Sequence, residues 1–298
     1  MKTILFIALG FFTLSYLWIW ISEMRTHPVD PGKKRRPGWI DSGIGFITNF
    51  FDTLGVGSFA TTTSLFRFAQ TVRDEQIPGT LNVGHTLPTV AEVLIYVAIV
   101  QVDPVTLFAM IGASAIGAWL GAGIVARWPR RNIQIGMGIA LLVAAGFFLN
   151  SQFNSSPTGG MALGVTGTKL AIAVGVNMML GALMTLGIGL YGPCMILVAS
   201  LGMNPKAAFP IMMGSCAFLM PVASARFVRE RSYNLKAALG LAIGGVPGVL
   251  LAAYIVKELP LYWVKWLVIC VVVYTATMML RSAHFERTRK VAAVPAAR

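Results

Sequence analysis

The segment GAWLGAGIVARWP (117–129) has a second copy later in the chain, GVLLAAYIVKELP (248–260). The opening glycines and the closing prolines of the two segments lie 131 positions apart. Upstream, LGVGSFATTTS (54–64) corresponds to LGIGLYGPCMI (186–196) at a spacing of 132, so one insertion or deletion separates the two blocks. Duplicated halves inside an apolar chain are typical of transporters, which place their substrate site where two repeats meet.

The composition predicts an all-α polytopic membrane protein. Apolar residues make up 56% of the 298 residues and charged residues only 12%, whereas a soluble domain carries about 25% charged residues. Residues 105–126 contain no charge over 22 positions, which is long enough for a helix that crosses about 30 Å of hydrocarbon. The chain has none of the alternating ten-residue segments that are typical of membrane barrels.

The net charge of +13 does not indicate a nucleic-acid-binding protein. The basic residues lie in short clusters between apolar runs, a pattern typical of cytoplasmic loops beside anionic lipid headgroups. Cys194, Cys216 and Cys270 are widely spaced inside apolar runs, so they indicate neither a disulfide framework nor a metal site. We expect no nucleic-acid partner, no metal and no cofactor.

The chain divides at its polar stretches. An apolar run from Thr3 to Ile21 follows Lys2 but lacks a small-residue cleavage site, so it is interpreted as a retained helix and not as a signal peptide. The expected units are an N-terminal transmembrane helix with a basic cytoplasmic loop (1–39), repeat one (40–150), a polar extracytoplasmic linker (151–167), repeat two (168–281) and a basic cytoplasmic tail (282–298).

The distribution of Lys and Arg favours an inverted topology. If every apolar run crossed the membrane, the loop 101–104, which has no Lys or Arg, would share a side with the basic cluster 33–36. If the Gly-rich segment that opens each repeat enters and leaves on one side, 19 of the 24 basic residues lie inside, with the C-terminus. Each repeat then has this re-entrant segment and three crossings, and the second repeat is inverted. Eight crossings in two groups of four, with long broken helices, remain the alternative.

The Gly-rich segments are the first candidate binding site. Glycine exposes backbone, and nearby hydroxyls can satisfy the groups that a helix break releases. Two half-helix starts that face each other can hold an anion through their amides and dipoles. Close packing of helices through small residues is the alternative explanation. The residues concerned are Gly55, Gly57, Ser58, Thr61 and Thr62 in the first copy, and Gly189 and Tyr191 in the second.

The next expected helix carries a buried histidine. Asn82, His85 and Thr89 share one helix face, because they are three and four positions apart. A histidine at membrane depth is a candidate ligand or proton relay, although it can also serve only as a hydrogen-bonding link between helices. Glu92 is explained equally well by proton coupling and by solvation at an interface.

The second repeat does not duplicate the histidine. Ser215 corresponds to His85, so substrate or proton specificity can enter at this asymmetric position. Arg226 follows on the same segment, either as a contact for an anion at the cytoplasmic mouth or as one of the topology charges.

Four stretches together resemble the sulfite exporter TauE/SafE family of permeases: the paired Gly-x-Gly segments at 55–57 and 187–189, IPGTLNVGHTLPT (77–89) and LGMNPKAAFPIMMGSCAFLMP (201–221). The resemblance covers roughly residues 40–280. It implies a multi-pass carrier of the bacterial inner membrane that moves sulfite, organosulfonates or related anions, commonly outward. The family pattern has three successive glycines after the first Gly-x, whereas Ser58 follows Gly57 here, which leaves the shape of the site and the substrate open.

The expected function is therefore a secondary transporter, not an enzyme, that exports a small sulfur oxyanion by alternating access. Asp52, His85 and Glu92 are the residues that can couple protons, and the other binding candidates are those named above. An anion channel or an uptake permease of the same architecture, an intramembrane hydrolase with a Ser58–His85 dyad, and a structural role are the alternatives. The sequence leaves the coupling ion and a homodimer open.

Overall fold

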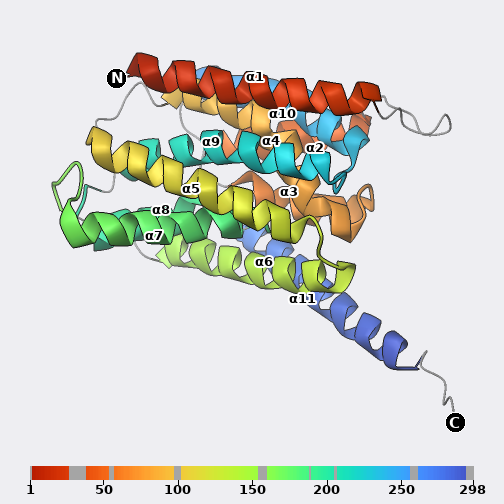
Figure 1. The fold of residues 1–298 in the computed structure, drawn as a ribbon. Helices are drawn as coiled ribbons and strands as arrows, with labels where there is room; N and C mark the ends of the chain where they lie inside the picture. Colours follow the sequence, from red (N-terminus) through yellow and green to blue (C-terminus); the bar gives the residue numbers. More distant parts are fainter. Residues whose placement is uncertain are drawn as a thin grey trace, which may run out of the picture.

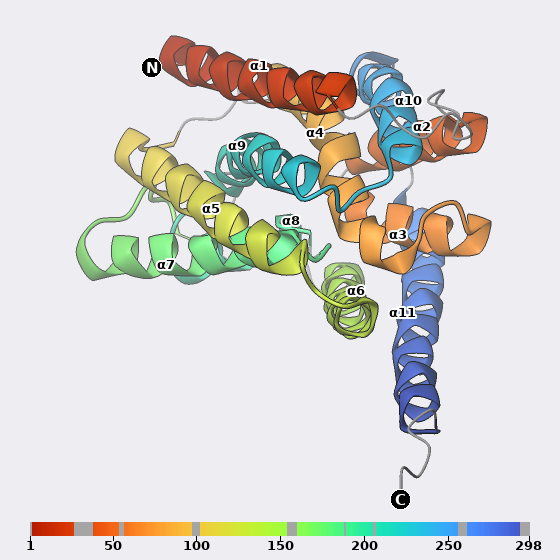
Figure 2. The same cartoon turned by 45° about the vertical axis from the view of Figure 1, so that its right-hand side comes forward.

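The structure, a computed structural model, describes residues 2–26, 38–53, 57–96, 102–153, 160–187, 189–204, 207–255 and 261–292. These residues form a bundle of helices (Figure 1). Neighbouring helices are inclined to one another and not parallel (Figure 2). The elements are α1 (Lys2–Thr26), α2 (Trp39–Thr53), α3 (Ser58–Ala69), η1 (Asp74–Gln76), α4 (Ile77–Tyr96), α5 (Pro104–Val125), α6 (Arg130–Phe153), α7 (Gly167–Met184), α8 (Tyr191–Ser200), α9 (Ala208–Arg229), α10 (Leu235–Ile255) and α11 (Leu261–Ala292).

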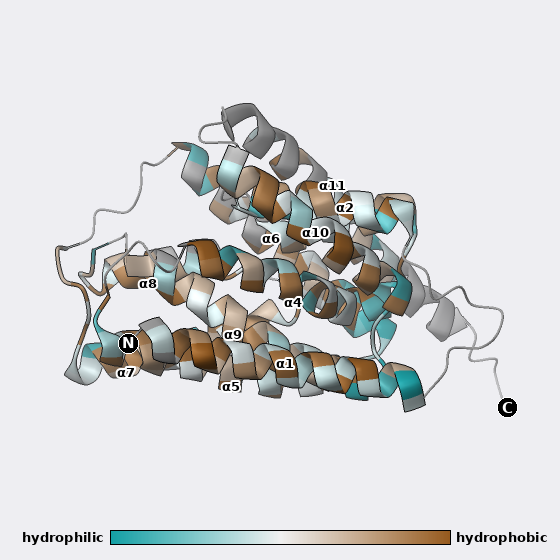
Figure 3. Cartoon of the chain, turned by 90° about the horizontal axis from the view of Figure 1, so that it is seen from above, coloured by the Kyte–Doolittle hydropathy of each residue, from teal (hydrophilic) through white to brown (hydrophobic). Residues whose placement is uncertain are grey.

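Long apolar helices confirm the prediction of an all-α polytopic fold. Among the described residues, five helices are long and apolar enough to cross a membrane, and no strand occurs beyond one isolated bridge. Figure 3 shows that the hydrophilic residues gather towards the helix ends. The five candidate spans are Leu5–Thr26, Pro104–Val125, Gly167–Met184, Pro210–Arg229 and Leu235–Tyr254.

The first Gly-rich segment is broken into α2 and α3. Gly57 precedes α3 with a φ of 82°, in the left-handed region that favours glycine. The start of α2 lies beside the start of α10, because Gly240 packs against Asp41. Arg67 in the last turn of α3 bonds Asp74 just before α4. The segment therefore begins and ends at the same end of the bundle, where Gln76 also donates to the carbonyl of Tyr233 at 3.3 Å.

The second Gly-rich segment is broken into α7 and α8, and it enters from the opposite end. Gly187 follows α7 with a φ of 100°. Lys169 in the first turn of α7 donates to the carbonyl of Leu201 at 3.1 Å, so the start of α7 lies beside the end of α8. This end is also where Asp103, just before α5, meets the loop before α7 through a bond from its amide to Leu163.

The helix packing has the symmetry that two inverted halves would produce. Helix α2 packs on α10 as α7 packs on α5, and α4 packs on α10 as α9 packs on α5. Helix α3 contacts α11 as α8 contacts α6, while α4 with α9 and α6 with α11 pair across the centre. Exchanging α2–α6 with α7–α11 converts α2–α10, α4–α10 and α3–α11 into α7–α5, α9–α5 and α8–α6, and it leaves the pairs α4–α9 and α6–α11 unchanged. Common ancestry of the halves stays a prediction, and this packing supports it.

Two glycine contacts follow the same register. A Cβ at Gly117 would collide with the carbonyl oxygen of Met178, and a Cβ at Gly248 with that of Phe46. The two glycines lie 131 positions apart and their carbonyl partners 132. The duplicated segments thus bring α5 onto α7 and α10 onto α2 at the closest possible backbone distance, as small residues do in membranes.

We expect Gly117→Val to destabilise the protein by about 1–3 kcal/mol, the usual cost of overpacking. Gly112→Val is the matched control on the same helix, because nothing lies within 4 Å of its Cβ position. Thermal unfolding of the two purified variants in detergent measures the difference. Equal melting temperatures would contradict the close contact with Met178.

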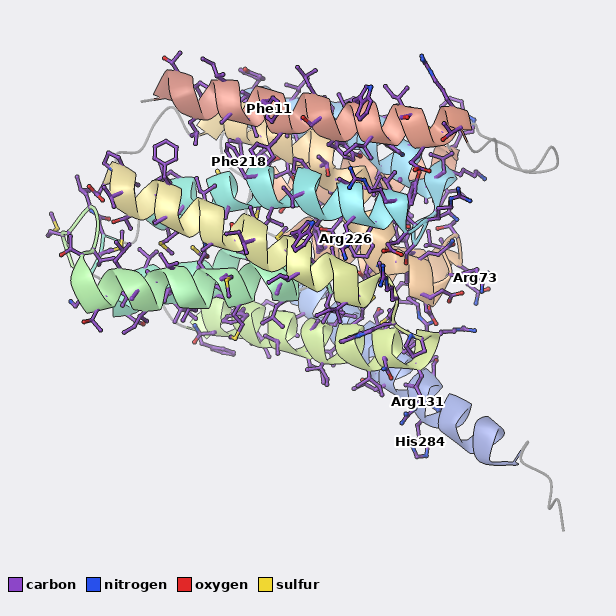
Figure 4. The ribbon with its side chains drawn as sticks, viewed as in Figure 1. Phe11, Arg73, Arg131, Phe218, Arg226 and His284 are labelled. Atoms are coloured by element: carbon purple, nitrogen blue, oxygen red, sulfur yellow. The ribbon has the colours of Figure 1, made fainter. Side chains whose placement is uncertain are left out.

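Basic loops gather at one end of the bundle, where Figure 4 places Arg73, Arg131 and His284. The buried Asp74 carboxylate is 2.5 Å from Arg67 Nη1 and 3.2 Å from Arg130 Nη2. On the exposed surface beside it, the Arg127 hydrogen bond at 2.6 Å lowers the pKa of the Glu230 carboxyl. The loops that were predicted to share a side are thus adjacent.

One boundary differs from the expected units. Helix α11 continues to Ala292, so it runs through the boundary predicted at 281, and the tail begins as part of this helix. Helix α1 lies outside the two halves, where it packs across α9 and α4. There Tyr16 donates to the carbonyl of Val83 at 2.9 Å.

Candidate functional site

His85 is the centre of a buried polar cluster formed by α2, α3 and α4. Its side chain is fully buried. Its Nδ1 lies 3.0 Å from Asn49 Oδ1 on α2, and its Nε2 lies 3.0 Å from Thr62 Oγ1 on α3. The ring also stacks on Phe59 with 5.7 Å between centroids. The histidine therefore joins both halves of the broken segment to the next helix.

The hydrogen bonds determine which ring nitrogen carries the proton. Asn49 donates from Nδ2 to the carbonyl of Gly45 at 2.7 Å, which orients its Oδ1 towards His85. An amide oxygen only accepts, so Nδ1 of His85 is protonated. In the neutral ring Nε2 then accepts from the Thr62 hydroxyl, and in the charged ring Nε2 donates to it. Both charge states can be satisfied by rotation of one hydroxyl.

Asp52 lies next to the helix start that was predicted to bind an anion. Ser58, the first residue of α3, lies near the Asp52 carboxylate and interacts with it through both its hydroxyl and its backbone amide. Glu92 on α4 is buried and interacts electrostatically with Asp52. A carboxylate thus occupies a position where a helix dipole favours negative charge.

The remaining predicted residues of the first half have local partners. Thr61 donates within its own helix, to the carbonyls of Gly57 and Ser58 at 3.0 and 2.9 Å. Asn82 donates to the carbonyl of Pro78, and its Oδ1 is buried with no hydrogen-bond partner among the described residues. Gly55 lies outside the described residues.

The second half contains a related but simpler cluster. Asn177 on α7 donates to Ser215 Oγ on α9 at 3.1 Å and to the carbonyl of Met110 on α5 at 2.7 Å. The pair Asn177–Ser215 therefore corresponds to Asn49–His85. Gly189 is described, with open space at its Cβ position. Tyr191 begins α8, and its side chain lies outside the described residues.

Sulfur atoms from the second half lie close to the acids of the first. Cys216 on α9 is 3.8 Å from Met184 Sδ and interacts electrostatically with Asp52, Glu92 and Cys194. Cys194 is in the first turn of α8. Asp52 beside the start of α3 and Cys194 in the first turn of α8 thus both act on Cys216, and the facing of the two half-helix starts stays a prediction. No metal-ligating group of three or more His, Cys, Asp or Glu occurs in the described part of the chain.

Asn49 and Asn177 were not among the residues predicted from the sequence. Each is an amide inside the apolar run that opens one half, and the two lie 128 positions apart. The available signal was that both halves have an asparagine at a similar position. A single polar residue inside a long hydrophobic run is noticed only when the two halves are aligned residue by residue.

Comparison with known proteins identifies the family. The family model described as sulfite exporter TauE/SafE matches residues 1–148 and 169–297. The match is wider than the range 40–280 expected from the motifs, since it includes α1 and most of the tail. No curated protein and no solved structure matches the chain. Because the family model covers nearly the whole sequence, the chain belongs to the sulfite exporter TauE/SafE family of membrane permeases.

Proposed function

We propose that the protein is a secondary carrier that exports a small sulfur oxyanion, sulfite or a short organosulfonate, across the bacterial inner membrane. The observation that carries the proposal is the His85 cluster, a buried polar site at the break of a membrane helix. Intramembrane polar groups of this kind mark transport paths in membrane proteins. Family membership supplies the class of substrate.

The symmetric packing supports alternating access. The broken segments enter from opposite ends, and each half packs on the other through equivalent helix pairs. Rocking of one half against the other around a central site exposes that site to each side in turn. The two clusters differ, because one contains a histidine and the other a serine. Only the side of the site that is formed by the first half therefore has an ionisable imidazole.

Asp52 supports coupling to protons. Its carboxylate interacts with the amide of Ser58, a group that an incoming oxyanion would need, so the two anions would compete for it. Protonation of Asp52 removes this competition, so anion and proton would bind together. The other titratable groups that face Asp52 are Glu92 on α4, Cys216 on α9 and, through Cys216, Cys194 on α8.

The gathered basic loops support a cytoplasmic location for that end of the bundle and for the C-terminus, because Lys and Arg are retained on the cytoplasmic side. Cysteine labelling of a Ser232→Cys variant from outside intact cells tests this orientation. Labelling without permeabilisation would place the basic end outside.

The hydrolase alternative lacks its dyad. Both ring nitrogens of His85 are already used, by Asn49 and Thr62, so neither is left to activate Ser58. An anion channel has the same architecture, and saturation of the flux distinguishes it from a carrier.

Uptake of radiolabelled sulfite into proteoliposomes under an imposed pH gradient tests the proposal. We expect saturable flux that depends on the gradient, and Asp52→Asn is expected to keep flux but lose most of its dependence on the gradient. Ser64→Ala is the matched control, since the Ser64 hydroxyl bonds only the carbonyl of Ala60 in its own helix, at 3.0 Å. Flux of neither sulfite nor a short organosulfonate above empty liposomes would reject the carrier.

A further inference from the structure

A groove between α1, α5 and α9 lies apart from the His85 cluster. Its volume is about 190 Å³, and its lining combines apolar side chains with two guanidinium groups. The volume equals that of about six water molecules, so the groove has room for part of a larger ligand and not for a whole lipid. The lining includes Phe12, Ile19, Trp119, Val222, Arg226 and Arg229.

Arg226 is the unusual residue of this groove. Its guanidinium carbon lies 4.8 Å from the centre of the Trp119 ring, over the ring face. Its Nε is buried and has no hydrogen-bond partner among the described residues. Arg67 and Arg127 form ion pairs with carboxylates, whereas Arg226 forms none in the described part of the chain, where Glu230 acts on it only through a longer-range electrostatic interaction. The side chain is half-buried beside α5 (Figure 4).

The groove is bordered by α1, whose outer face has the composition expected of a lipid-facing helix. The outer face of α1 exposes large apolar residues, including Phe11 at 67% and Trp18 at 72%. Figure 4 shows Phe11 on this outer helix and Phe218 beneath it, towards α9. The polar end of the groove is marked by Arg229, one turn beyond Arg226, near the basic end of the bundle.

We propose that this groove binds an anionic phospholipid, with the phosphate at Arg226 and Arg229 and an acyl segment against the apolar lining. Charge complementarity carries the assignment, because two guanidinium groups that form no ion pair in the described part of the chain meet an apolar groove near the basic end of the bundle. Guanidinium groups suit phosphate oxygens through paired hydrogen bonds, and basic pockets between membrane helices bind lipid headgroups in this manner. Helix α1 packs on α4 of the first half and on α9 of the second half. The lipid would therefore link α1 to the transport unit.

Quenching of tryptophan fluorescence by brominated phosphatidylglycerol in phosphatidylcholine nanodiscs tests the proposal on the full chain. Subtraction of the signal from Trp119→Phe isolates the tryptophan at the groove among the seven in the chain. We expect quenching of Trp119 to saturate at low mole fractions of phosphatidylglycerol, and brominated phosphatidylcholine not to reproduce it. Arg226→Gln should weaken binding about fivefold or more, and Arg226→Lys less.

Two further variants keep the test decisive. Arg73→Gln is the control, because Arg73 is an exposed arginine at the same end and pairs with Glu75. Ala225→Leu retains the charge and fills the groove, so it should also reduce binding even if Arg226→Gln does not fold. Equal quenching by both lipids, an unchanged Arg226→Gln or displacement by millimolar phosphate or sulfite would overturn the proposal. Displacement would assign the groove to a free anion, and quenching that depends on protein density would assign it to a second copy of the chain.

Discussion

His85→Ala is expected to reduce sulfite flux by at least about tenfold while the protein still folds. The substitution leaves Asn49 Oδ1 and the Thr62 hydroxyl without their buried partner. Each unsatisfied buried group costs about 1–3 kcal/mol, and 1.4 kcal/mol corresponds to a factor of ten in an equilibrium. The cost falls on the geometry of the helix break, where we propose that backbone amides of the protein bind the substrate.

Thr62→Val tests the hydrogen bond of His85 separately from the space that the histidine ring fills, because the ring stays in place. It removes the hydroxyl that faces Nε2, so we expect a smaller loss of flux in the same direction. Thr63→Val is the matched control on the same helix, because the Thr63 hydroxyl bonds only the carbonyl of Phe59, at 2.8 Å. Initial rates in proteoliposomes at equal protein content provide the comparison. Wild-type rates in both His85→Ala and Thr62→Val would remove the cluster from the mechanism.

Asp74→Asn is expected to lower the free energy of unfolding by about 3 kcal/mol, the lower end of the range for a broken buried ion pair. Asp74 is 3% exposed, and it accepts from Arg67, Arg130 and Gln134. The lower end applies because the Arg130 side chain is 55% exposed and can return to water. The loss would loosen the end of α3 from the start of α6.

The exposed pair at the same end provides the control. Glu230→Gln removes the partner of Arg127, and exposed pairs contribute little to stability. Thermal unfolding in detergent at neutral pH compares the two variants. A melting temperature of Asp74→Asn equal to that of Glu230→Gln would show that Asp74 is not the centre that joins these loops.

Much of the architecture could be predicted from local chemistry. Gly57 and Gly187 mark the two helix breaks, because both adopt positive φ values that other residues avoid. The charge-free span 105–126 predicted α5 within one residue at each end. The clustering of Lys and Arg predicted which loops lie together, since charges are excluded from hydrocarbon and collect beyond it.

The candidate site was predicted only in part. His85 was identified because an ionisable residue inside an apolar run is expensive to bury. Its partners were not all identified, since Asn49 lies 36 positions away and nothing in local periodicity relates the two. Thr62 was chosen as a member of a hydroxyl cluster, in which the sequence does not distinguish it from Thr61, whose hydroxyl bonds its own helix.

The sequence by itself determined the class and the position of each break, because these depend on hydrophobicity, on charge and on the backbone freedom of glycine, and it predicts the duplication. The tertiary structure decided which side chains meet. The Asn49–His85–Thr62 cluster, the Asp52–Ser58 contact and the stacking of Arg226 on Trp119 each join different helices. Such contacts depend on how helices rotate and cross. In a membrane, packing and small-residue contacts set those angles, and these act between segments distant in the chain.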